Sequence, residues 1–208
     1  MASWGGFQPI LGRRLQEDPA GPPLSAVALI HRYHQRSKHR PGLYADGPET
    51  LDWDSQPNPF RHFKDTEVIE LPLSAKRMPS SPSTLFGDGC PPLPLSLESL
   101  GAFFELSLAL NAWKSFGPDR WALRCAPSSG NLHPTEGYLL AMGLPELQDG
   151  LYHYDAEHHA LERRALHVLP ASETPRCWVG LTSIHWREAW KYGERAFRYC
   201  HLDLGHVM

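Results

Sequence analysis

Pro127-Ser128-Ser129-Gly130-Asn131 is the stretch of sequence that decides the fold. It lies between Arg124 and His133-Pro134 and leads into an apolar segment, residues 138–142, which predicts a buried strand. A loop of Ser, Gly and Asn can bring backbone N–H groups and short side chains against a flat ligand with polar edges. Because a surface turn is the commoner use of such residues, the loop indicates a ligand site only together with a second motif.

The second motif lies about sixty residues later and reads Trp186-Arg187-Glu188-Ala189-Trp190-Lys191-Tyr192-Gly193-Glu194-Arg195. Lys191 and Tyr192 offer two groups that exchange protons. Neighbours on a regular helix point about 100° apart, so both side chains can face one site only where the helix ends, and Gly193 favours such a break. The alternative is a surface lysine beside a half-buried tyrosine that packs in the core.

Taken together, the two motifs resemble the nitroreductase superfamily. The resemblance is closest to its azoline-oxidising (thiazole- and oxazole-forming, SagB-type) dehydrogenases and their tandem-domain relatives, and it covers roughly Pro94 to Met208. It implies an α+β, nitroreductase-like sandwich: a mostly antiparallel sheet with helices around it. It also implies an FMN-dependent oxidoreductase that moves hydride between the flavin and a small molecule or a modified peptide.

The resemblance assigns roles to eight residues. Lys191 and Tyr192 are the implied catalytic pair, and we expect the ammonium to lower the pKa of the phenol. The implied FMN-binding residues are Arg124, Pro127, Ser128, Ser129, Gly130 and Asn131. A guanidinium offers several donors in a fixed fork, which suits Arg124 to a phosphate or a ring oxygen. The family also implies a partner, either a second copy of the chain or a second nitroreductase-like domain.

The composition excludes several other classes of protein. With 41% apolar and 11% aromatic residues, the 208-residue chain is expected to be globular. A net charge of −3 gives no reason to expect a nucleic-acid partner, and no run of residues is long and apolar enough for a membrane span. Four scattered cysteines without a Cys-x-x-Cys pair fit free thiols, so we expect a cytoplasmic location.

Twelve histidines raise the question of a metal site. His31 and His34 are three residues apart on an expected helix, and His158 and His159 are neighbours on an expected turn. No acidic residue completes a recognisable ligand cluster at either place, so the sequence predicts no metal.

The chain divides into a Pro-rich N-terminal arm, residues 1–94, and a partial nitroreductase-like domain, residues 95–208. In the arm, only Leu24 to Arg36 has the pattern of a helix, with Ser25 as its cap. In the domain, Ser96 caps a helix whose apolar face runs to Leu110 and which should end before Gly117-Pro118. Further expected elements are a hairpin of residues 151–154 and 160–163, a strand at 178–182 and a helix at 195–208.

The final helix contains no stop signal before Met208, which indicates a chain that ends inside a helix: a truncated product, a fragment or an alternative isoform. The Arg-rich segment that grips the FMN phosphate in many nitroreductases has no counterpart at residues 83–90, which contain no arginine. The alternative function is therefore a non-catalytic interaction module that binds a partner through Phe197, Cys200 and Leu204 on an exposed final helix. A third alternative is a chain that does not fold alone.

Overall fold

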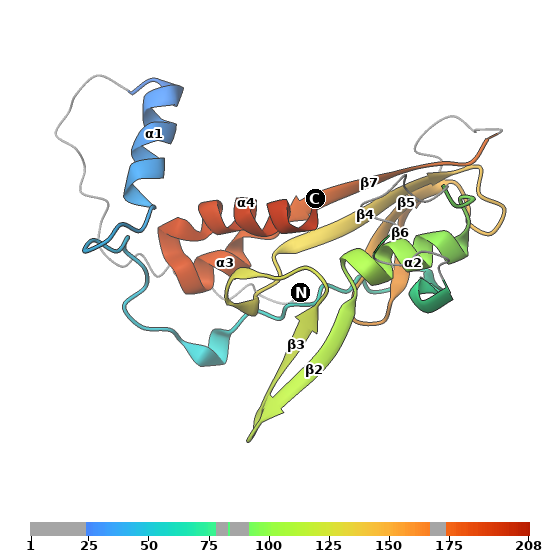
Figure 1. The fold of residues 1–208 in the computed structure, drawn as a ribbon, viewed down its shortest axis with the longest axis horizontal. Helices are drawn as coiled ribbons and strands as arrows, with labels where there is room; N and C mark the ends of the chain where they lie inside the picture. Colours follow the sequence, from blue (N-terminus) through green and yellow to red (C-terminus); the bar gives the residue numbers. More distant parts are fainter. Residues whose placement is uncertain (1–23, 78–82, 84–91, 167–173) are drawn as a thin grey trace, which may run out of the picture.

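The computed structural model describes residues 24–77, 83, 92–166 and 174–208. Most of the segment 83–90, whose lack of arginine departs from the family pattern, lies outside these residues. The described chain forms one five-stranded sheet, a separate two-stranded hairpin, and helices that gather at one face and one end of the sheet (Figure 1). This arrangement is α+β, as predicted.

The five strands of the main sheet follow the order β1-β6-β5-β4-β7, and every neighbouring pair is antiparallel. Their bounds are β1 (Val68–Glu70), β4 (Thr135–Met142), β5 (Gly150–Asp155), β6 (Ala160–Leu166) and β7 (Arg176–Ser183). The strand predicted at 138–142, the hairpin around residues 155–159 and the strand at 178–182 are all confirmed. Each was marked in the sequence by short apolar or alternating runs bounded by turn residues.

The helix predicted after Ser96 exists but is shorter than expected. It is α2 (Leu97–Ser107), and its start is a capping box: Ser99 N–H donates to Ser96 Oγ at 3.2 Å, and Ser96 N–H donates to Ser99 Oγ at 3.0 Å. The prediction that the helix continues to Leu110 and ends only before Gly117-Pro118 is wrong.

Residues 110–124 instead form a hairpin of β2 (Leu110–Phe116) and β3 (Asp119–Arg124). The two-residue turn between them contains Gly117 at φ +57°, a left-handed conformation that glycine adopts without strain. The hairpin extends away from the main sheet in Figure 1. It places Arg124 directly before the Ser-Ser-Gly-Asn loop.

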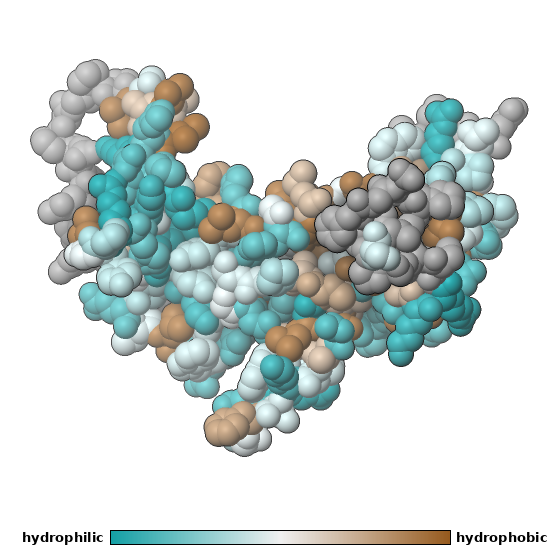
Figure 2. Space-filling model, in the orientation of Figure 1, coloured by the Kyte–Doolittle hydropathy of each residue, from teal (hydrophilic) through white to brown (hydrophobic). Residues whose placement is uncertain are grey.

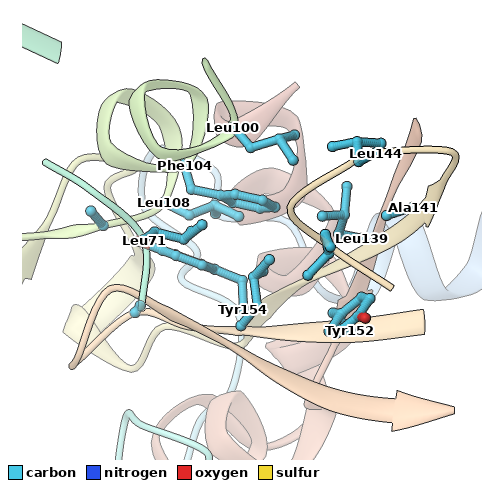
Figure 3. Close-up of a cluster of buried hydrophobic side chains, with 13 residues drawn as sticks. Leu71, Leu100, Phe104, Leu108, Leu139, Ala141, Leu144, Tyr152 and Tyr154 are labelled. Carbon is cyan, nitrogen blue, oxygen red and sulfur yellow. The ribbon is translucent and has the colours of Figure 1, made fainter. Parts of the chain in front are cut away.

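The hydrophobic core lies between α2 and one face of the sheet. Phe104, fully buried on α2, stacks on Tyr154 of β5 with ring centroids 4.4 Å apart, and Leu139 of β4 lies in the same cluster (Figure 3). Gly137 allows this close approach, because a Cβ built there would come within 2.6 Å of Leu108 Cδ1. Burying a side chain such as Phe104 contributes roughly 1.5–3 kcal/mol to stability.

Three helices lie outside this core. They are α1 (Ala26–Arg36), α3 (His185–Tyr192) and α4 (Ala196–Val207). The predicted Ser25 cap is confirmed, since its Oγ accepts a hydrogen bond from Ala28 N–H. No residue of α1 is buried, and apolar side chains gather on its outer end (Figure 2). α1 reaches the rest of the protein through Tyr33, whose hydroxyl accepts from Arg198 N–H at 2.9 Å and donates to Glu194 O at 3.0 Å.

The rest of the arm is part of the sheet and of its packing. β1 pairs with β6 as an edge strand, which the Pro-rich pattern did not indicate. Phe60, Leu71 and Ser74 of the arm are buried. Among the described residues, no helix combines the length and the apolar character that a membrane crossing requires.

Candidate functional site

The Ser-Ser-Gly-Asn loop forms a short 3-10 turn, η4 (Ser129–Asn131), between β3 and β4. Gly130, Asn131 and His133 have φ values of +62°, +60° and +48°. Left-handed backbone is uncommon outside glycine, and three such residues within four positions hold the loop in a sharply turned shape. Residues 130–133 therefore form a defined, tightly turned loop.

Asp203 of α4 holds this bend in place. Its buried carboxylate accepts hydrogen bonds from Ser128 Oγ at 2.7 Å, from Ser129 Oγ at 2.8 Å and from Ser129 N–H at 3.0 Å. Ser128 Oγ in turn accepts from His133 N–H at 2.8 Å. The two serine hydroxyls predicted to hold a flavin are thus engaged with Asp203.

The end of α3 lies against Gly130. A Cβ built on Gly130 would be 2.7 Å from the Tyr192 hydroxyl oxygen and 3.1 Å from Lys191 Nζ. The helix ends at Tyr192, and Gly193 follows at φ +53°, so the predicted break is confirmed. The fold therefore brings together the loop and the Lys-Tyr pair that the sequence separates by about sixty residues.

The surroundings of Tyr192 differ from the expectation. Burial raises the pKa of Tyr192 to about 12, with the carboxylates of Glu188 and Asp203 adding to the shift. The prediction that a neighbouring ammonium lowers this pKa is wrong, because burial and negative charge outweigh the cations nearby. The ring lies 4.2 Å from that of Tyr199, centroid to centroid. Tyr192 is therefore a neutral phenol at physiological pH.

Glu188 is the buried acid of this region, and no sequence pattern singles it out. It is fully buried on α3, and within the described residues neither carboxylate oxygen has a hydrogen-bond partner. Burial and the charge of Asp203 raise its pKa to about 8, although the nearby Lys191 acts to lower it. Glu188 can therefore hold or release a proton near neutral pH beside Lys191.

Arg124 lies at the base of the loop, where the arm covers it. One Nη donates to the Pro59 carbonyl, and the guanidinium carbon lies 4.9 Å above the Phe60 ring. Burial lowers its pKa to about 10. Arg124, Pro127 and Ser128 line a small hollow under the loop together with Thr135. In the described part of the chain, Arg124 Nε and Thr135 Oγ1 are buried without a partner.

His133 and Asn131 face each other within the bend, with His133 Nε2 2.9 Å from Asn131 Oδ1. Burial lowers the pKa of His133 to about 3, and the charge of Arg124 adds to this shift. The imidazole is therefore neutral, and its contact with Asn131 helps to hold the conformation of the loop.

A second buried polar group lies on the face of the sheet opposite α2. His153 of β5 places Nε2 2.8 Å from Glu136 Oε2 and Nδ1 2.8 Å from Glu162 Oε2, and Arg187 Nη1 donates to Glu136 Oε1 at 2.6 Å. All four residues are buried. They link β4, β5 and β6 to α3, the helix that ends in Lys191 and Tyr192.

This chain is similar to known proteins in sequence and in fold. No model of a known protein family matches it. The chain is 27% identical over 100 residues to "Putative nitroreductase MJ1384" of Methanocaldococcus jannaschii, a match that covers 43% of this chain and 50% of the relative. The crystal structure of a "putative nitroreductase" from Anabaena variabilis superposes with a TM-score of 0.63 at 27% identity, covering 86% of this chain and 36% of that one.

The chain thus spans half of the length of the curated relative and about a third of the crystallised one. By sequence and by fold, this chain is similar to these two putative nitroreductases.

Proposed function

We propose that this chain contributes an FMN site to an oxidoreductase that transfers hydride between the flavin and a small molecule or a modified peptide. The observation that carries the proposal is the approach of Lys191 and Tyr192 to Gly130. Two segments that carry the family resemblance meet at one half-exposed place, although nothing in local sequence requires them to do so. Nitroreductase homology supports the oxidoreductase class.

The residues at this place fit a flavin ring in their chemistry. Gly130 is exposed at the tip of the bend, and Asn131, Lys191 and Tyr192 are half-buried around it. An amide, an ammonium, a phenol and a backbone turned at φ +62° offer donors to the polar edge of an isoalloxazine. The hollow beneath the loop is too small for the ring, so the ring would lie on the open side of Gly130.

The other predicted cofactor residues would act on the shape of the loop. Ser128 and Ser129 bind Asp203, and this contact fixes the direction in which the Gly130 peptide faces. Arg124 would add positive charge at the base of the loop. Pro127, exposed before the bend, would restrict the backbone there.

FMN supplies a ring nitrogen that accepts or gives a hydride, and this chain supplies the protons. Tyr192, kept neutral by burial, can donate from its hydroxyl. Lys191 Nζ places positive charge where negative charge develops on the substrate or the ring. Glu188, buried on the same helix and with a pKa of about 8, can restore the proton.

A second candidate function is a non-catalytic module that binds a second copy or a second nitroreductase-like domain. It is favoured by exposed apolar side chains on β7 and α4: Trp178, Phe197 and Leu202 are 49%, 54% and 51% exposed. The expectation that Cys200 shares this exposed face is wrong, because Cys200 is only 4% exposed. For the oxidoreductase, we also propose a cytoplasmic location and the azoline-oxidising subclass.

Titration of the full chain with FMN, followed by flavin absorbance and fluorescence, tests the proposal. We expect saturable binding that Lys191→Ala weakens by about tenfold, which corresponds to 1.4 kcal/mol. Tyr192→Phe should keep the binding and slow the oxidation of bound, chemically reduced FMN by a nitroaromatic acceptor, by about a hundredfold. Lys114→Ala, an exposed lysine on β2, is the matched control.

If the wild-type chain binds no FMN but elutes as a dimer, the interaction module is the better description. If it binds FMN and neither Lys191→Ala nor Tyr192→Phe differs from Lys114→Ala, the residue roles are wrong.

A further inference from the structure

Three potential metal ligands meet at the turn between β5 and β6. His62 comes from the arm, Asp155 ends β5, and His158 lies on the turn itself. Asp155 Oδ2 is 3.2 Å from His62 Nδ1 and 2.6 Å from His158 Nδ1, and the three atoms all lie within 4.8 Å of one another. Two imidazole nitrogens and one carboxylate oxygen therefore face a common point.

The Asp155 carboxylate is already oriented for this point. Its other oxygen, Oδ1, accepts the backbone N–H of Glu157 at 2.9 Å and that of His158 at 3.4 Å. The side chain is only 5% exposed, so the turn fixes its direction. A carboxylate held in this way by outer hydrogen bonds is typical of a metal ligand.

His62 has the second contact that a metal-bound histidine usually makes. Its Nε2 lies 2.9 Å from Glu157 Oε2, while Nδ1 faces Asp155. A histidine that binds a metal through one ring nitrogen almost always donates from the other, commonly to a carboxylate. Glu157 supplies that acceptor, and it fixes the ring so that Nδ1 faces the cluster.

We propose that His62, Asp155 and His158 bind one Zn²⁺ ion, with the fourth position open to solvent. Two nitrogens and one oxygen suit zinc, whereas magnesium and calcium prefer oxygen ligands alone. Ligands about 2.0–2.1 Å from a tetrahedral zinc are about 3.3 Å apart. The 3.2 Å between His62 Nδ1 and Asp155 Oδ2 matches this separation, whereas the 2.6 Å between His158 Nδ1 and Asp155 Oδ2 would have to lengthen. Small rotations of the exposed imidazoles accommodate the remainder.

The ion would clip the arm onto the sheet. The segment around His62 also supplies the Pro59 carbonyl to Arg124 and the Phe63 N–H to Glu162 Oε1, and the Phe63 ring covers His153. A zinc ion that bridges His62 and His158 would therefore fix the segment that covers both the base of the loop and the buried polar group around His153. The proposed role of the ion is to hold the arm in place, and zinc binding itself does not require flavin.

Calorimetric titration of the full chain with ZnCl₂ tests this site. We expect one ion per chain, with binding lost in His62→Ala and His158→Ala. His206→Ala, which removes an exposed histidine from α4, should leave the affinity unchanged. Glu157→Gln should weaken binding by about ten- to a hundredfold, the usual effect of an outer carboxylate. The His158 side chain is 66% exposed, so its removal should leave the fold intact.

Two further readouts separate this site from incidental binding. Zinc should raise the melting temperature of the wild type and of His206→Ala, but not that of His158→Ala. Bound Co²⁺ should show no thiolate charge-transfer band, since the ligands are nitrogen and oxygen. A thiolate band, a wild type without stoichiometric zinc, or binding by His62→Ala and His158→Ala that is as tight as in the wild type would each overturn the proposal.

Discussion

Asp203 and Ser129 are joined by three hydrogen bonds across 74 residues of sequence. Asp203 Oδ1 accepts from the Ser129 N–H at 3.0 Å and from its hydroxyl at 2.8 Å, and Asp203 Oδ2 accepts from the same N–H at 3.1 Å. α4 thereby fixes the bend that carries Gly130. The loop most characteristic of the family resemblance is shaped by a residue that lies outside both sequence motifs.

Asp203→Ala should lower the free energy of unfolding by about 2–4 kcal/mol, because it removes charge-assisted hydrogen bonds and leaves the half-buried donors of Ser128 and Ser129 without an acceptor. Urea denaturation followed by tryptophan fluorescence measures this loss. Asp46→Ala, an exposed aspartate of the arm, is the control and should change stability by less than about 0.5 kcal/mol.

A double-mutant cycle with Ser129→Ala isolates the contact itself. We expect a coupling energy above about 1 kcal/mol between positions 129 and 203, as is typical of residues that share a network. Additive effects of the two substitutions would mean that Asp203 acts in another way, for example through Glu188.

Gly130→Ala tests whether the bend needs room for the Lys-Tyr pair. An added Cβ would lie 2.7 Å from the Tyr192 hydroxyl oxygen and 2.8 Å from Lys191 Cδ, in a backbone at φ +62°. Left-handed backbone alone costs an alanine about 1–2 kcal/mol. We expect a greater total loss, measured by urea denaturation, and weaker FMN binding.

Gly117→Ala is a close control for this prediction. Gly117 has nearly the same backbone, φ +57°, but a Cβ added there would meet no atom of the described structure within 4 Å. Both variants therefore carry the backbone strain, and only Gly130→Ala carries the clash. Equal losses of stability in the two variants would show that Lys191 and Tyr192 do not constrain the loop.

Local pattern predicted most of the sheet and part of the site. The alternating hairpin, the Ser25 and Ser96 caps and the break at Gly193 follow from residues within a few positions of one another. The hairpin at 110–124 was missed, because the apolar helical spacing that begins at Leu97 continues past Ser107 to Leu110. The structure shows that the turn at Gly117 and pairing with β3 prevail there.

Long-range contacts account for what the sequence did not predict. Asp203 and Glu188 look like ordinary helix residues until the fold buries them beside the loop. The raised pKa of Tyr192 follows from that burial, which no spacing reveals. His62 is 93 residues away from Asp155, so a search for local ligand spacing does not group His62 with Asp155 and His158.

Glu188 predicts a specific dependence of stability on pH. Its pKa rises from 4.5 to about 8 on folding, so between these values the folded protein holds a proton that the unfolded chain has released. The free energy of unfolding therefore falls as the pH rises through this window, by at most about 1.4 kcal/mol per pH unit, and the stabilisation is fully present only below 4.5.

Glu188→Gln should remove the part of the pH-dependent loss of stability that comes from the deprotonation of Glu188. Urea denaturation at pH 5, 6, 7 and 8 measures the difference between wild type and variant, and that difference should shift in favour of the variant as the pH rises. Glu146→Gln, at an exposed position, should run parallel to the wild type. A Glu188→Gln curve parallel to the wild type would contradict the raised pKa.

His153 is the centre of the buried charge group, and its loss should be among the most damaging single changes in the protein. Both ring nitrogens lie 2.8 Å from carboxylate oxygens, of Glu136 and of Glu162, and only a ring protonated on both can donate to both. Removing it leaves carboxylates buried without their partner, at a cost of about 3–5 kcal/mol. Guanidinium denaturation of His153→Ala, with the exposed His201→Ala as control, measures this cost.

The charge of Glu162 can be tested more strictly with the double variant His153→Ala, Glu162→Gln. Glu162→Gln keeps an oxygen for the Phe63 N–H, which now donates to Glu162 Oε1 at 3.0 Å, but it removes the negative charge. Alone, it should destabilise the protein, because His153 loses an ionic partner. Combined with His153→Ala, it should restore part of the lost stability, since one uncompensated charge is gone. Additive losses would instead assign the cost of His153→Ala to the cavity left by the missing ring.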